Sequence, residues 1–201
     1  MSDLICVTNR EICKGDFLTR TEEIARSEVK SIILREKDLN EDAYTALARQ
    51  VMVICKKYET PCILHSYVGV ASTLGADRIH LPLHMLRVMT YREKSRFSVI
   101  GASCHSIEEA KEAEERGCTY ITAGHVFDTE CKKGLPGRGL AFLREICESV
   151  SVPVYAIGGI DVSNYNAVRS TGAAGACIMS GFMQCGNVQK YMERYWAEHE
   201  I

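Results

Sequence analysis

The sequence lacks the segments that mark membrane and secreted proteins. It contains no apolar stretch long enough to span a bilayer, and its start, MSDLICVTNR, has no basic segment followed by the apolar run of a signal peptide. Its formal charge is only -2, which leaves no basic field to attract a nucleic-acid backbone. We therefore expect a cytoplasmic protein that binds neither membranes nor nucleic acids.

No two of the ten cysteines have the C-x-x-C spacing of many zinc and redox sites. Cys6, Cys62, Cys104 and Cys177 lie inside apolar runs, where a free thiol behaves as a small buried hydrophobic group. Cys131 lies in a polar loop and is expected to be exposed. The pattern favours reduced thiols over a disulfide framework or a zinc site.

The chain also has no linker, low-complexity stretch or block of like charges, so we expect residues 1–201 to form a single domain. Short apolar runs follow one another along it, and several are rich in the residues of strands that are buried on both faces. The runs occupy residues 4–8, 31–36, 62–66, 78–82, 98–103, 120–124, 153–159 and 175–180.

Helical patterns separate these runs. Asn40 is expected to cap a long helix, Ser106 and Glu109 form a capping-box pattern, and either Asp161 or Ser163 can start another helix. Consecutive strands begin roughly 16 to 33 residues apart, which is typical of strand-helix-strand crossovers in a parallel sheet. The number of such units predicts a closed barrel.

An open doubly wound sheet is the alternative arrangement. Its dinucleotide or phosphate fingerprint would follow the first strand, but CVTNREICKG contains neither G-x-G-x-x-G nor a P-loop. Glycines suited to a phosphate occur late, after the last two strands, where a barrel commonly places that site. The sequence therefore favours an α/β fold of one domain, a compact (β/α)8 TIM barrel close to its minimum length.

Two glycine-containing segments follow the last two strands. AIGGIDVSN runs from a strand through paired glycines into a capped helix, so backbone amides can point at an anion. IMSGF has the same features. A tight turn explains either segment alone, but their adjacent barrel positions together predict a phosphate site that includes Gly159, Ser180 and Gly181.

Two cations follow the second strand. Arg35 and Lys37 alternate with Ile33, so all three share one face of the strand and its extension. A cation inside a barrel needs a partner or a ligand. Ion pairs with Glu36 or Asp38 are one explanation, and an anionic substrate is the other.

A histidine and a basic loop follow the sixth strand, in AGHVFDTECKKGLPGRGL. An imidazole that titrates near neutral pH suits general acid and base chemistry, so His125 is the candidate catalytic residue, with a structural histidine as the alternative. Lys132, Lys133 and Arg138 lie in a glycine-containing loop that suits either a flap over a charged substrate or a solvated surface.

Three further histidines follow strands, at His65, His84 and His105. No carboxylate accompanies them at the strand ends, and His80 with His84 spans a strand-to-helix junction instead of one helix face. We therefore expect no metal site.

Several motifs in chain order resemble the thiamine phosphate synthase superfamily. They are LREKD after the second strand, GASCHSIEEA at the fifth, GHVFDTECKKG after the sixth, AIGGI at the seventh and GAAGACIMSG at the eighth. The resemblance covers nearly the whole chain. It implies a small barrel enzyme, usually a homodimer, that handles the thiazole phosphate half of thiamine.

The superfamily has two branches, and this chain departs from the first. The synthase branch joins a pyrimidine diphosphate to a thiazole phosphate with magnesium, using an Asn-Asp pair after the third strand and an Asp after the fourth. Those positions hold His65, Ser66 and His84 here, so both magnesium-binding carboxylates are absent. The synthase also has proline where this chain has His125, and glutamine where it has Ile33.

The second branch, the TenI-like thiazole tautomerases, resembles this chain at those positions. It implies an isomerase that aromatises a carboxylated thiazole phosphate tautomer without a metal or redox cofactor. His125 would move the proton, Gly159, Ser180 and Gly181 would hold the phosphate, and Lys132 with Arg35 or Lys37 would hold the carboxylate. Ser103 and Thr129 match binding positions of the family. The alternatives are a thiamine phosphate synthase with unusual ligands and a non-catalytic regulatory binder. His80 and His105 are interpreted as structural.

Overall fold

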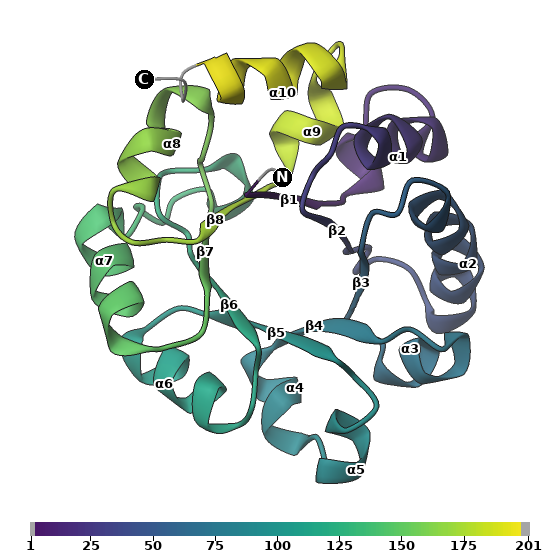
Figure 1. Cartoon of the computed structure of the whole chain (residues 1–201), viewed down its shortest axis with the longest axis horizontal. Helices are drawn as coiled ribbons and strands as arrows, with labels where there is room; N and C mark the ends of the chain where they lie inside the picture. Colours follow the sequence, from purple (N-terminus) through teal and green to yellow (C-terminus); the bar gives the residue numbers. More distant parts are fainter. Residues whose placement is uncertain (1–2, 198–201) are drawn as a thin grey trace.

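The computed structural model describes residues 3–197 and shows a closed barrel of parallel strands (Figure 1). β8 pairs with β1, where Cys6 lies opposite Ile178, and this pairing closes the barrel. The strands are β1 (Leu4–Val7), β2 (Ser31–Leu34), β3 (Cys62–His65), β4 (Arg78–Pro82), β5 (Val99–Cys104), β6 (Tyr120–Gly124), β7 (Val154–Ile157) and β8 (Gly175–Ile178). All eight expected strands are present, so the predicted TIM barrel is confirmed.

Helices surround the barrel (Figure 1). They are α1 (Phe17–Arg26), α2 (Glu41–Lys57), α3 (Val68–Leu74), α4 (Leu83–Val88), α5 (Tyr91–Lys94), α6 (Ile107–Glu115), α7 (Gly139–Ser149), α8 (Val162–Arg169), α9 (Ser180–Gln184) and α10 (Val188–Ala197), with short 3-10 turns η1 (Arg10–Ile12) and η2 (Glu130–Lys132). Asn40 caps α2, as expected. Within residues 3–197 no helix combines the length and apolar character that a bilayer crossing requires.

The starts of two helices refine the expectations from sequence. Asp161 caps α8, and the amide of Ser163 donates to its carboxylate at 2.8 Å, so the first of the two alternatives is correct. Ser106 caps α6 by accepting from the Glu109 amide. The Glu109 carboxylate instead accepts from the amide of His105, at 2.6 Å. The reciprocal half of the expected capping box is therefore displaced by one residue.

The apolar residues form two clusters because strand side chains alternate between the two faces of the barrel wall. The larger cluster fills the space between wall and helices. The smaller cluster lies inside the barrel and consists of Ile5, Val7, Ile33, Ile63, Tyr120, Tyr155 and Cys177. Every cysteine with a described side chain is a free thiol, and the side chain of Cys131 lies outside the described part of the chain.

A polar layer lies above the interior apolar cluster. The His80 ring contacts the Tyr120 hydroxyl through Nδ1 and the Ser103 hydroxyl through Nε2, both at 2.8 Å. The His65 ring stacks on that of His80, with centroids 5.7 Å apart, and its Nδ1 lies 2.7 Å from Ser66 Oγ. Burial lowers the pKa of His65 to about 2 and that of His80 to about 3, so both rings are neutral near pH 7.

A glycine makes the central contact of this layer possible. Gly101 pairs with His80 on one side and with Tyr120 on the other. A Cβ at this position would overlap both the Tyr120 ring and His80 Nδ1. The missing side chain therefore lets two neighbouring groups meet across the strand between them.

The first prediction concerns that glycine. Gly101→Ala should lower the free energy of unfolding by roughly 3 kcal/mol, because the added methyl group forces the His80 and Tyr120 side chains apart. Urea denaturation would measure the change. Gly186→Ala is the matched control, since nothing lies within 4 Å of a Cβ built there. Equal stabilities of the two variants would contradict the prediction.

The second prediction concerns pH. Below pH 6.5 an unfolded histidine takes up a proton, whereas folded His65 and His80 remain neutral down to their lowered pKa values. Stability should therefore fall as the pH falls, by up to about 1.4 kcal/mol per pH unit for each buried histidine. Urea denaturation at pH 6 and pH 5 would measure the slope. His65→Asn should reduce it by about one histidine's share, and an unchanged slope in the variant would refute this account.

Candidate functional site

The barrel brings the predicted site residues to one rim, because the carboxyl ends of all parallel strands meet there. Arg35 and Lys37 follow β2, and Ser103 lies near the end of β5. His125, Thr129 and Lys132 belong to the loop after β6, Gly159 follows β7, and Ser180 and Gly181 begin α9 after β8. The predicted residues thus come from five strand ends.

A hydrogen-bonded platform holds the backbone of Arg35. Its amide donates to Thr8 Oγ1 at 3.0 Å, and the Thr8 hydroxyl donates to Glu36 at 2.6 Å. The amide of Arg10 donates to the other oxygen of Glu36 at 3.0 Å. Burial raises the pKa of Glu36, opposed by these hydrogen bonds. Sequence reasoning missed Thr8 and Arg10, because contacts between β1 and β2 loops depend on long-range pairing.

The platform decides between the two explanations for the cations after β2. Both oxygens of Glu36 are bound by Thr8 and Arg10, and Asp38 forms an ion pair with the Arg10 guanidinium. Neither carboxylate therefore pairs with Arg35 or Lys37. The explanation by local ion pairs fails.

A third cation joins these two. Desolvation of the Lys37 ammonium group lowers the pKa of Lys37, and the positive charges of Arg35 and Lys132 lower it further. The charges of Arg35 and Lys37 also lower the pKa of His65 below them. Across residues 3–197, the side chains of Arg35, Lys37 and Lys132 form no ion pair and no hydrogen bond. We call these three residues the cation cluster. Its charges suit an anionic ligand.

The loop after β6 is a compact turn. His125 is half-buried, and its Nε2–H donates to the Leu135 carbonyl at 3.1 Å. The Arg138 amide donates to the His125 carbonyl at 3.0 Å, and the Arg138 guanidinium lies 5.2 Å from the centre of the Phe142 ring. The Lys132 amide donates to the Thr129 carbonyl at 2.9 Å. The described contact of the His125 ring is thus one that holds the loop.

The glycines after β7 have a packing role. A Cβ on Gly158 would overlap the Cβ of His125, and one on Gly159 would press against Phe127. The Phe127 amide also donates to the Gly158 carbonyl at 3.0 Å. The glycine pair therefore lets the loops after β6 and β7 lie in contact, which is the tight-packing alternative for this motif. Anion binding by Gly159 stays a prediction.

The histidines after β3, β4 and β5 lie apart from one another. His65 is buried in the interior layer, His84 is exposed on α4, and His105 Nδ1 donates to the Gly124 carbonyl at 2.8 Å. Among the described residues, no three His, Cys, Asp or Glu side chains are grouped as they would be around a metal ion. His80 and His105 both make the structural contacts that were expected of them.

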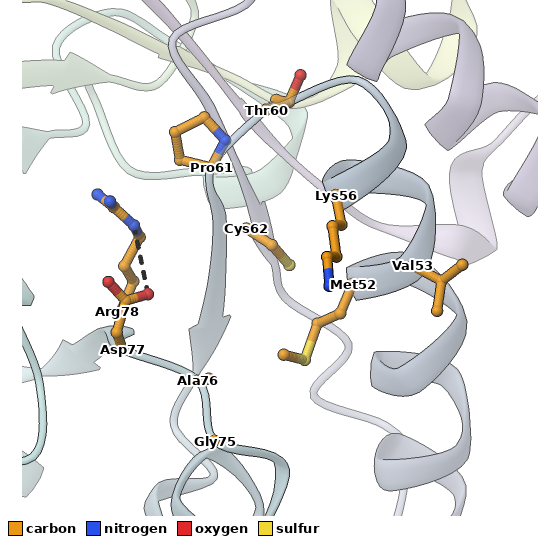
Figure 2. Close-up of a pocket in the computed structure, with 10 residues that line it drawn as sticks. All are labelled: Met52, Val53, Lys56, Thr60, Pro61, Cys62, Gly75, Ala76, Asp77 and Arg78. Carbon is orange, nitrogen blue, oxygen red and sulfur yellow. Dashed lines mark ion pairs between the residues drawn. The ribbon is translucent and has the colours of Figure 1, made fainter.

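A cavity of about 330 Å³ lies at the other end of the barrel (Figure 2). It borders the amino-terminal ends of β3 and β4, where Cys62 and Arg78 begin the two strands, and the second half of α2. Met52 and Lys56 line it from the helix. None of the predicted site residues contributes to this cavity, so it is not the site at the rim.

Comparisons with known proteins agree with the motifs. A family model described as thiamine monophosphate synthase matches residues 4–182. The thiamine-phosphate synthase of Fusobacterium nucleatum is 34% identical over 190 residues, which cover 93% of this chain and 92% of the relative. That of Pyrococcus abyssi is 36% identical over 163 residues, covering 81% and 79%. The thiamine phosphate pyrophosphorylase structure from Pyrococcus furiosus has a TM-score of 0.82 at 28% identity, covering 96% and 93%.

These relatives correct the expected activity. The departures at His125 and at the metal positions predicted an isomerase, a thiazole tautomerase, with a synthase as the alternative. The two sequence relatives reported above are named thiamine-phosphate synthase, which is a transferase, and they match most of the chain. The prediction of an isomerase is therefore wrong, and the alternative is favoured. The chain belongs to the thiamine monophosphate synthase family, as its motifs indicated.

Proposed function

We propose that the protein is a thiamine-phosphate synthase, a transferase that joins a pyrimidine diphosphate to a thiazole phosphate. The observation that carries the proposal is the cation cluster at the rim of a barrel whose relatives have this name. The product retains one phosphate, so the diphosphate must leave as a polyanion. Groups that stabilise charge on a leaving group lower the barrier of such a reaction.

The cation cluster is suited to hold the diphosphate. The guanidinium of Arg35 can donate two parallel hydrogen bonds to phosphate oxygens, and the ammonium groups of Lys37 and Lys132 act as mobile point charges. Within residues 3–197, none of these side chains has to break an ion pair to bind it. Arg35 is half-buried, which strengthens its interaction with an anion.

The thiazole phosphate is assigned to the loops after β7 and β8, which are neighbouring strands. The first intrahelical hydrogen bond of α9 runs from the Met183 amide to the Met179 carbonyl, at 3.0 Å. The amides of Ser180 and Gly181 precede that bond and therefore lack a helical acceptor. Gly159, exposed on the neighbouring loop, completes this phosphate site, and Ser103 on β5 and Thr129 in the loop after β6 supply hydroxyl groups.

His125 is a positioning residue in this proposal. Its ring holds the Leu135 carbonyl, which closes the turn that carries Lys132. An acid-base role for His125 stays a prediction. The homodimer and the cytoplasmic location inferred from the sequence also stay predictions.

The third prediction tests the transferase activity and the role of Lys132. The purified protein, mixed with the pyrimidine diphosphate and the thiazole phosphate, should form thiamine phosphate and release diphosphate in equal amounts, measured by chromatography. Lys132→Met should lower kcat/KM at least about tenfold, because about 1.4 kcal/mol or more of transition-state stabilisation is lost.

The matched control is Lys190→Met, which removes an exposed lysine from the outer helix α10. It should change kcat/KM by less than about twofold, because it lies on no loop of the rim. No thiamine phosphate from the parent protein would refute the proposed function. Equal losses in the two variants would refute the role of Lys132.

A further inference from the structure

The side chains at the expected metal positions do not fit a magnesium ion. His65 is buried, its Nδ1 lies 2.7 Å from Ser66 Oγ, and its ring stacks on His80. His84 is exposed on α4. Magnesium is bound through carboxylate, carbonyl and water oxygens in octahedral geometry. Two imidazoles and one hydroxyl that already contacts an imidazole do not provide such a donor set.

Three carboxylates on the loops after β2 and β6, those of Glu36, Asp38 and Asp128, are already bound by the protein. Both oxygens of Glu36 accept hydrogen bonds, from Thr8 at 2.6 Å and from the Arg10 amide at 3.0 Å. Asp38 pairs with the Arg10 guanidinium, and Asp128 accepts from the Gly137 amide at 2.7 Å. A divalent ion would have to displace these contacts to gain oxygen ligands from Glu36, Asp38 or Asp128.

The cation cluster repels a divalent ion and attracts a polyanion. Arg35, Lys37 and Lys132 come from loops after β2 and β6 that are distant in sequence, yet their charges act on one another. No described carboxylate pairs with them. The charge that a bound metal would bring to a diphosphate is therefore already present on protein side chains.

We infer that this site binds diphosphate through Arg35, Lys37 and Lys132 alone, without a divalent metal ion. The identity of the anion rests on the proposed function, whereas the metal-free binding follows from the side chains at the rim. The protein would differ in this respect from synthases that hold magnesium with carboxylates. Its catalysis would then be insensitive to chelators.

The fourth prediction is a direct binding measurement. Inorganic diphosphate is titrated calorimetrically into the parent protein in a buffer with EDTA, and again with magnesium in place of EDTA. Binding in EDTA that is at least as tight as binding with magnesium would support the inference. Lys132→Met should weaken the affinity in EDTA at least tenfold, whereas Lys190→Met should leave it unchanged. Binding that requires magnesium, or no binding in EDTA, would overturn the inference.

An activity assay separates this inference from the proposed function. Thiamine phosphate formation at the same rate in EDTA and in magnesium would support both. A rate abolished by EDTA and restored by magnesium would overturn the metal-free site and leave the synthase standing. No product in either buffer would refute the synthase, while the diphosphate titration would still decide whether the anion site works without a metal.

Discussion

Positive charge that no ion pair neutralises within residues 3–197 is the interaction on which the rim depends. Arg35, Lys37 and Lys132 repel one another, and this repulsion opposes folding. The hydrogen bonds of Thr8 and Glu36 fix the backbone at Arg35. The end of β2 therefore cannot shift to increase the distance between Arg35 and the other two cations. An anion that binds the folded state removes the repulsion and stabilises the protein. The same charges therefore weaken the empty barrel and favour its ligand.

The barrel interior adds no further positive charge to the cation cluster. His65 and His80 lie beneath the cation cluster, and protonation of either ring would add another positive charge in a buried layer. Burial prevents this, because a charged imidazole loses its hydration there. The gap at Gly101 lets His80 contact Tyr120, so the neutral ring still has partners for both nitrogens. The interior thus supports the rim without competing for its anion.

The fold was predictable from the sequence because its signals are local or periodic. Strands buried on both faces appear as short apolar runs, and Asn40 and Asp161 act within their own helix turns. The hydrogen-bond partners of individual side chains were harder to predict from the sequence. Glu36 lies between Arg35 and Lys37 in the sequence. Its carboxylate nevertheless accepts a hydrogen bond from Thr8, which follows β1 and is distant in the sequence. The paired glycines were ambiguous as well, since a phosphate loop and a close loop contact require the same missing side chain.

The prediction of an isomerase rested on His125 and on the missing metal carboxylates, and each of these has a second explanation. An imidazole can move a proton or hold a loop, and the sequence is identical in both cases. The ring of His125 donates to the Leu135 carbonyl, a contact that needs no change of reaction. The missing carboxylates also have two effects. A carboxylate in place of His65 would lie within the field of Arg35 and Lys37 and would neutralise them. Its absence therefore removes a metal ligand and, by the same change, leaves two cations available to bind the diphosphate directly.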